Sequence, residues 1–210
     1  YDCIWLPNGI EGVNGNSEGS RAFQKFSPSG TVSGALGHNL PTKEVYGLFA
    51  DNDKRKSAYF IVTKNGVIGT GKLKQTSATV ADGGSNVIVL RYADVLLMLA
   101  ECYAEKDNVS KSNEYLNLIK KRAGIEEVSI GDVTLIKEEI ALERRKELVN
   151  EGHRWFDLIR TGKAVEVMNA YFTRTPGYTG ITISELNYVQ PIPQGQIDTD
   201  SATKQNEGYN

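Results

Sequence analysis

The sequence is poor in the residue types that bind metals or form disulfides. Its 210 residues include two cysteines and two histidines. Cys3 and Cys102 lie far apart and form no C-x-x-C pair. His38 lies in a glycine-rich stretch and His153 among charged residues, and neither has a plausible set of metal ligands nearby. The sequence therefore predicts no metal site and no cofactor.

Long hydrophobic runs are also missing. The longest apolar stretch, residues 87–100, is interrupted by Arg91 and Asp94 and is shorter than the roughly 20 residues that a membrane-spanning helix needs. Cys102 continues this apolar helical pattern, so we expect a small buried side chain and not a reactive thiol. Cys3 has no apolar segment before it and does not have the context of a lipid-attachment cysteine.

Neither sign of charge dominates the chain. The 24 lysines and arginines are balanced by 26 aspartates and glutamates, which gives a formal net charge of −2. No basic stripe of the kind that binds nucleic acid or an anionic membrane surface is present. Residues 69–72 resemble a fragment of a phosphate-binding loop but are too few to form one. A chain of this length suits one domain or one piece of a larger one.

Glycine, serine and asparagine break up the first part of the chain. Residues 1–45 show neither the two-residue period of strands nor the 3.6-residue period of helices. A strand-like run at residues 59–63 precedes Asn65-Gly66, a pair that favours a two-residue type I′ turn. We therefore predict a loop-rich region over residues 1–86 with a β-hairpin near residues 59–68.

Helical periodicity dominates residues 87–210. It predicts a helix over residues 87–105 and a second from Ser110 to the helix-terminating Gly124, which together form a helical hairpin. A third helix is predicted to start at Asp132 or Thr134. The residues expected to face inward in the second and third helices are Tyr115, Leu118, Ile119, Ile136, Ile140 and Leu148.

The end of the chain changes character. Residues 175–180 have turn composition, and Ile181-Thr182-Ile183 has the alternation of a short strand. Pro191 and Pro193 then favour an extended tail. The fold class that follows is mainly α (α+β), a tetratricopeptide-like helical arrangement with a loop-rich region and short β-hairpins, although no 34-residue repeat is visible in the chain.

The most distinctive stretch is residues 143–160, where dense charge meets Trp155 and Phe156. Read as a helix that bends near Gly152, it places charged residues at three- and four-residue steps in one row. These residues are Arg144, Glu147, Glu151, Arg154, Asp157 and Arg160. We expect the two glutamates to pair with the flanking Arg144 and Arg154, and Trp155 to lie in the core.

Glu147 and Glu151 also have the spacing of a catalytic carboxylate pair. Four residues apart on a helix, their β-carbons would lie about 5–6 Å apart, a separation compatible with the carboxyl groups of glycosidases. A general acid, however, needs a raised pKa, whereas neighbouring arginines lower the pKa of a carboxylate. We therefore predict that the chain is not an enzyme.

Several segments together resemble one known family. They are Asp53-Lys54-Arg55 and residues 90–101, 118–124, 143–160, 191–193 and 205–209. In this order they resemble the SusD/RagB family of outer-membrane nutrient-binding lipoproteins of Bacteroidetes, specifically its C-terminal portion. The resemblance implies a SusD-type architecture in which residues 87–210 form the C-terminal helical region and the whole chain is one structural unit of a longer parent.

The resemblance also implies a function. It predicts non-catalytic binding of poly- or oligosaccharides on the extracellular face of the outer membrane, for uptake through a SusC-like TonB-dependent transporter. The lipid anchor of the parent protein is expected to lie outside this chain, and no nucleic-acid partner is expected. The alternative is a protein-interaction module or peptide binder with no glycan site of its own.

Two sets of site residues follow. A sugar presents a C–H face and a rim of hydroxyls, so we expect aromatic and polar side chains near the N-terminus to bind it. The candidates are Tyr1, Trp5, Asn8, Arg21 and Tyr46. The resemblance implies a structural signature made of Asp53, Arg55, Arg91, Tyr92, Glu143, Arg144, Glu147, Glu151, Arg154, Trp155 and Asp157. Within it, Asp53 and Arg55 are expected to form an ion pair that orients a loop.

Overall fold

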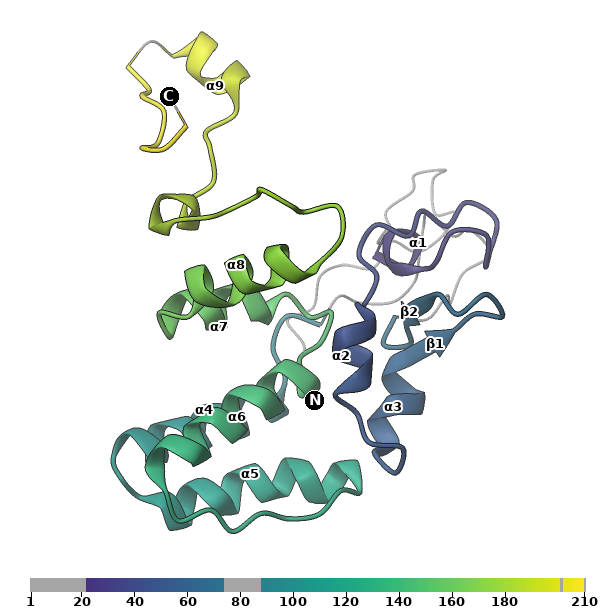
Figure 1. The fold of residues 1–210 in the computed structure, drawn as a ribbon, viewed down its shortest axis with the longest axis vertical. Coiled ribbons are helices and arrows are strands. Elements are labelled where there is room, and N and C mark those ends of the chain that lie inside the picture. The colour runs from purple at the N-terminus through teal and green to yellow at the C-terminus, as the bar shows by residue number, and fades with distance from the viewer. Residues whose placement is uncertain (1–21, 74–87, 201, 210) are drawn as a thin grey trace, which may run out of the picture. The chain divides into compact units, whose positions relative to one another are not determined.

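The computed structural model describes residues 22–73, 88–200 and 202–209. The chain forms two compact units, one ending at Gly152 and the other beginning at His153. Figure 1 traces both units along the chain. Helices dominate the described residues, and a small two-stranded sheet accompanies them, which confirms the mainly α class. The boundary expected at residue 86 lies outside the described residues.

In the described part of the first unit, three short helices precede the sheet. They are α1 (Ala22–Phe26), α2 (Lys43–Gly47) and α3 (Lys54–Tyr59). The side chain of Thr42 caps α2 by accepting a hydrogen bond from the Val45 N–H at 3.2 Å. Asp53 caps α3 in the same way, with 3.0 Å to the Arg55 N–H. Local capping therefore creates helical turns in a region where the sequence predicted mostly loop.

The predicted hairpin is present, but its turn differs from the expected one. Strand β1 (Phe60–Val62) pairs antiparallel with β2 (Ile68–Thr70), with Phe60 opposite Thr70. The Gly66 N–H bonds to the Thr63 carbonyl at 2.9 Å, and within this loop Gly66 alone has a positive φ. A type I′ turn centred on Asn65-Gly66 would need a positive φ at both residues. The glycine therefore ends a longer connection.

The main core of the first unit lies between three helices. They are α4 (Tyr92–Glu105), α5 (Val109–Ala123) and α6 (Val133–Glu147), which lie side by side in Figure 1. One buried cluster joins them: Ala93, Leu96, Leu97, Ala100, Ala104, Leu116, Ile119, Ile136 and Ile140. The predicted helical hairpin and the third helix packed on it are thus confirmed.

Capping and helix-terminating residues in the sequence predicted some of the helix ends correctly. Gly124 ends α5 with φ +74°, as predicted, and Asp132 caps α6 by accepting from the Leu135 N–H at 2.9 Å. Two starts were placed wrongly. The cap of α5 is Asn108, whose side chain bonds to the Lys111 N–H at 3.1 Å, and not Ser110. Helix α4 begins at Tyr92, later than expected.

Two side chains expected inside lie on the surface. Leu118 is 47% exposed, and its neighbour Leu116 takes the core position. Cys102 is exposed as well. Its helix buries the face that carries Leu97, Ala100 and Ala104. Apolar residues occur around most of this helix, but only part of its surface is covered.

The second unit contains α7 (His153–Arg160), α8 (Ala164–Arg174), the 3₁₀ helix η2 (Glu185–Tyr188) and α9 (Gln194–Thr199). The strand predicted at residues 181–183 is wrong. The Asn169 side chain forms hydrogen bonds with both backbone polar groups of Ile183. It accepts from the Ile183 N–H at 2.8 Å and donates to the Ile183 carbonyl at 3.0 Å. The segment therefore stays irregular. Residues 190–193 have no regular secondary structure, but the tail is not extended throughout, because α9 follows directly at Gln194.

None of the helices in the described parts of the chain combines the length and the apolar character needed to cross a bilayer.

Candidate functional site

The charged row predicted along residues 144–160 is interrupted. Helix α6 ends at Glu147, and α7 begins only at His153. Between them Asn150 and Gly152 have φ values of +62° and +84°, which a continuing helix does not allow. The expected bend near Gly152 is thus a break, and Arg154 and Asp157 belong to the second unit.

The glutamates of this row lie instead in a network that we call the buried charge cluster. It is drawn from five separate parts of the first unit and consists of Asp53, Arg55, Tyr59, Lys72, Arg91, Arg122, Glu143, Lys146, Glu147 and Glu151. Charged groups are rarely buried unless they are paired and hydrogen-bonded. Each of these groups therefore needs a charged or hydrogen-bonding partner.

Arg55 lies at the centre of the buried charge cluster and is only 4% exposed. Its guanidinium binds Asp53 with two hydrogen bonds, 2.9 Å from Nε and 2.8 Å from Nη2. Nη1 donates to Glu147 Oε2 at 2.9 Å and also to Glu143. Burial alone would lower the pKa of Arg55, but Asp53, Glu143 and Glu147 outweigh it and raise the pKa. The expected ion pair between Asp53 and Arg55 is confirmed.

Glu147 is fully buried and surrounded by donors. Arg55, Arg91 and Arg122 form ion pairs with its carboxylate, and the Tyr59 hydroxyl lies 3.1 Å from Oε1. Burial by itself would raise the pKa of Glu147, but Arg91 and Arg122 lower it to about 2. Such a carboxylate stays ionised and cannot act as a general acid.

Glu151 is bound by Arg91 and Lys72. The Arg91 Nε lies 2.7 Å from Glu151 Oε2, and the Lys72 Nζ donates to Glu151 and to the Glu147 carbonyl. The same Nζ lies 3.9 Å from the centre of the Tyr59 ring. Burial lowers the pKa of Lys72 to about 8, although Glu151 opposes this shift. The carboxylates are thus held by cations from distant segments.

Glu147 binds Arg55, Arg91 and Arg122, and Glu151 binds Lys72 and Arg91, none of which helical spacing predicted. The expected pairing of Glu151 with Arg154 remains a prediction. Arg144 instead pairs with Asp94, 2.8 Å away and also buried. Tyr92, expected in the structural signature, is 66% exposed. Lys72 and Arg122 were not predicted, because helical spacing does not show which remote cation will reach a buried carboxylate.

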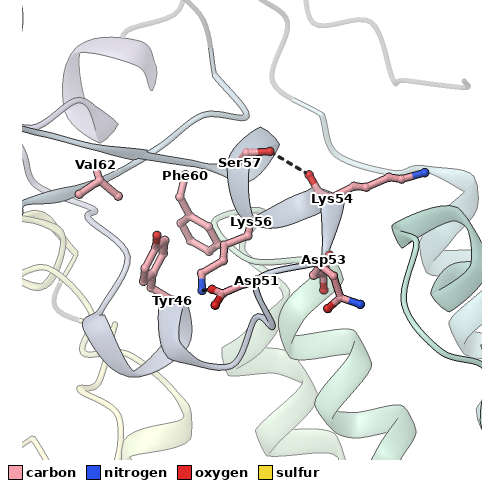
Figure 2. Close-up of a pocket in the computed structure, with 9 residues that line it drawn as sticks. Tyr46, Asp51, Asp53, Lys54, Lys56, Ser57, Phe60 and Val62 are labelled. Atoms are coloured by element: carbon pink, nitrogen blue, oxygen red, sulfur yellow. Dashed lines mark hydrogen bonds and ion pairs between the residues drawn. The ribbon is translucent and has the colours of Figure 1, made fainter.

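A hollow of about 580 Å³ opens beside α3. Its lining residues come from α2, α3, β1 and the loop between α2 and α3: Tyr46, Asp51, Asn52, Asp53, Lys54, Lys56, Ser57, Phe60 and Val62. Figure 2 shows the Tyr46 and Phe60 rings next to each other with Lys56 and Asp51 in front of them. The hollow thus combines an aromatic wall with a polar rim.

The Tyr46 ring is half-buried and held in place. Its centre lies 5.3 Å from that of Phe60 in an edge-to-face arrangement. The Lys56 Nζ lies 5.1 Å from the centre of the Tyr46 ring and 2.6 Å from Asp51 Oδ1. Aromatic pairs of this geometry gain about 0.5–1.5 kcal/mol beyond the area they bury. The ring orientation is therefore set without a ligand.

The buried charge cluster lies next to this hollow and shares Asp53 with it. Asp53 lines the hollow and also caps α3 and binds Arg55. Phe49 lies under the same charges, with its ring centre 5.6 Å from the Arg55 guanidinium and 4.9 Å from the Phe60 ring centre. The position of the aromatic wall therefore depends on ion pairs that reach α6.

Only one of the five predicted ligand-binding residues lies in the described part of the chain. Tyr46 lies in the hollow. Tyr1, Trp5, Asn8 and Arg21 lie outside the described residues, so their role remains a prediction. Trp155, expected in the core, is only half-buried. Within the described part of the chain, no group of three or more potential metal-ligating side chains is found.

The chain as a whole is similar to known proteins. The sequence profile of the SusD family matches residues 46–209. The chain belongs to this family. SusD-like protein P25 from Formosa agariphila is 26% identical over 208 residues, which cover 93% of this chain and 39% of that protein. SusD-like protein P38 from the same organism is 39% identical over 93 residues, covering 40% of this chain and 18% of its own length.

Solved structures of the SusD superfamily share the fold. Surface glycan-binding protein A from Bacteroides thetaiotaomicron matches with a TM-score of 0.71 and 27% identity over 90% of this chain. A second structure of that protein, in complex with laminarihexaose, gives a TM-score of 0.69 and 28% identity. The chain spans 46% of the length of that relative. The SusD-type architecture predicted from the sequence is thus confirmed.

Proposed function

We propose that this SusD-family chain is part of a non-catalytic glycan-binding protein on the outer face of a bacterial outer membrane. It would capture oligosaccharides for uptake through a SusC-like TonB-dependent transporter, with the parent protein anchored by a lipid. The observation that supports this most is the likeness in fold to surface glycan-binding protein A, whose structure with laminarihexaose is known.

The hollow beside α3 has the chemistry that such a ligand needs. A pyranose ring has an apolar C–H face and a rim of hydroxyls, and ligand sites are mostly apolar with a few placed polar groups. Tyr46 supplies an exposed part of a fixed aromatic ring, and Asn52, Ser57 and Lys56 supply donors and acceptors around it. A volume of about 580 Å³ is large enough for more than one sugar ring.

The burial and ionisation of Glu147 favour binding of a glycan without cleavage of its bonds. Glu147 has no exposed surface and keeps a pKa of about 2. Glycoside hydrolysis needs one carboxylic acid with a raised pKa next to the scissile bond. Glu147 meets neither condition, so we assign it to the support of the hollow.

Native gel electrophoresis in a panel of polysaccharides tests the proposal. We expect at least one glycan to retard the protein, with no release of reducing ends in the same mixture. Tyr46→Ala should reduce the retardation, whereas Tyr178→Ala removes an exposed tyrosine of the second unit and should leave it unchanged. Retardation by no glycan would contradict the proposal and favour a protein-interaction module. Reducing ends would contradict the non-catalytic assignment.

A further inference from the structure

The second unit has its own hollow, of about 410 Å³, separate from the one beside Tyr46. It is lined by Trp155, Met168, Ile183, Asn187, Gln190 and Tyr209. We propose that this hollow is a second binding site, which takes a ring of a neutral oligosaccharide. The choice of ligand class rests on the proposed function, whereas the site itself is defined by these residues alone.

Trp155 gives the hollow a flat apolar wall with a fixed orientation. Its ring centre lies 6.2 Å from that of Tyr188 at an interplanar angle of 84°, an edge-to-face contact. The indole is half-buried, so part of its surface stays open to the hollow. A half-covered, immobilised ring can stack on the C–H face of a sugar without losing much conformational freedom on binding.

Polar groups around this wall are free to bind hydroxyls. Asn187 Oδ1 accepts the Ser184 N–H at 2.9 Å, which leaves the amide N–H groups of Asn187 as donors. The Gln190 carboxamide and the Tyr209 hydroxyl make no hydrogen bond to any described residue. Together these groups offer donors and acceptors on the rim of one aromatic wall, the combination that a pyranose ring requires.

Residues 205–209, at the end of the described chain, hold these groups in place. Asn206 donates to the Gln190 carbonyl at 2.7 Å, and Gln205 bonds to the N–H and the carbonyl of Ile192 at 2.8 and 2.9 Å. Gly208 has a φ of +90°, and a β-carbon there would lie 3.0 Å from Leu186 Cβ. Only glycine fits this position easily, and it brings Tyr209 to the hollow. The site is therefore preorganised.

The charge of the lining selects among sugars. None of the described residues that line this hollow is charged at neutral pH. A uronate or sulfated ring would lose part of its hydration there without gaining a cationic partner, which is unfavourable. We therefore expect neutral oligosaccharides to bind and acidic ones of the same length to bind much more weakly.

Tryptophan fluorescence tests the site directly. Trp5 and Trp155 are the two tryptophans of the chain, so a Trp5→Phe protein reports on Trp155 alone. We would titrate it with laminarihexaose, cellohexaose, maltohexaose and mannohexaose, and with hexagalacturonate as the acidic probe. A saturable change in emission is expected with at least one neutral hexasaccharide, and no change with hexagalacturonate.

Two further variants in the same background distinguish binding from a general disturbance. Gln190→Ala should weaken the binding that Trp155 reports by about threefold to tenfold, the loss expected for a hydrogen bond. Gln194→Ala is the matched control, because the Gln194 side chain bonds to Asp198 outside the hollow and its loss should have no effect. Tyr46→Ala should leave the Trp155 signal in place.

Calorimetry on the same samples separates this site from the proposed function. If calorimetry detects binding but none of the neutral hexasaccharides changes Trp155 emission, the second site is overturned and the glycan-binding function stands. Equal weakening by Gln190→Ala and Gln194→Ala would also overturn it. If no hexasaccharide and no polysaccharide binds by any method, the proposed function itself fails.

Discussion

Arg55 Nη1 lies 2.9 Å from Glu147 Oε2, and the two residues are 92 positions apart in the chain. Both side chains are buried. This contact joins α3, which forms a wall of the hollow beside Tyr46, to the end of α6 in the three-helix core. Part of the predicted structural signature thus meets in space next to the hollow, namely Asp53, Arg55, Arg91, Glu143, Glu147 and Glu151. Arg154, Trp155 and Asp157 belong to the second unit.

Replacing Arg55 should therefore be costly. Arg55→Met leaves the carboxylates of Asp53, Glu143 and Glu147 without their shared partner. Removing one partner of a buried ion pair typically costs about 3–5 kcal/mol. We expect a loss of this size in the free energy of unfolding of the first unit, measured by urea denaturation followed by circular dichroism.

Arg145→Met is the control for that experiment. Arg145 also forms an ion pair, with Glu44 at 2.7 Å, but both partners are partly exposed. Pairs of this kind contribute about 0–1 kcal/mol. Similar losses for Arg55→Met and Arg145→Met would contradict the assignment of the buried charge cluster as the support of α3.

The low pKa of Glu147 predicts acid sensitivity. The folded-state pKa of about 2 lies below the ordinary value of 4.5, so the ionised carboxylate stabilises the fold above the higher value. This stabilisation is lost as the pH falls toward 2, and it amounts to about 3 kcal/mol. Urea midpoints measured from pH 6 to about pH 3 should fall steeply, and less so in Glu147→Gln, whose starting stability will be lower.

Lys72 should titrate far below an ordinary lysine. Burial lowers its pKa to about 8 from 10.5. Between these two pH values the unfolded chain holds more protons than the folded one, so this group makes the free energy of unfolding rise with pH. NMR of isotope-labelled lysine side chains, assigned with Lys72→Arg, measures the midpoint. Lys111, whose pKa is raised by Glu114, is the internal reference. A midpoint for Lys72 close to that of Lys111 would contradict its burial.

Gly71 should tolerate no side chain. A β-carbon there would lie 2.6 Å from the Ala58 carbonyl oxygen, a backbone atom that cannot move aside cheaply. We expect Gly71→Ala to destabilise the hairpin by about 1–3 kcal/mol. Gly131→Ala is the matched control, since nothing lies within 4 Å of the added atom. Equal melting temperatures for the two variants would show that the hairpin is less tightly packed on α3 than described.

Features that depend on neighbouring residues were predictable from the sequence. Gly124 and Asp132 mark helix ends because the capping hydrogen bonds involve residues within a few positions. Ile136 and Ile140 were identified as core residues because helical periodicity shows which residues share a face. The hairpin was found from its strand composition, although the conformation of its turn depends on backbone angles that Asn65-Gly66 alone does not determine.

Features that depend on remote contacts were not predictable. Spacing placed Arg144 next to Glu147 on one helix, but Arg144 pairs with Asp94 and the partners of Glu147 come from other helices and from the segment before α4. The strand expected at residues 181–183 failed for the same reason, because the side chain of Asn169 takes the hydrogen bonds of Ile183. The hollow beside Tyr46 likewise exists only once α2, α3 and β1 have packed.

We propose that the hollow beside Tyr46 binds glycan without cleaving it. Isothermal titration calorimetry with a glycan that retards the protein in gels, for the unmodified chain and for Tyr46→Ala, tests it most directly. Loss of a stacking ring should weaken binding at the hollow at least tenfold, a difference of about 1.4 kcal/mol or more, with no reducing ends formed. Unchanged affinity in Tyr46→Ala would contradict the claim.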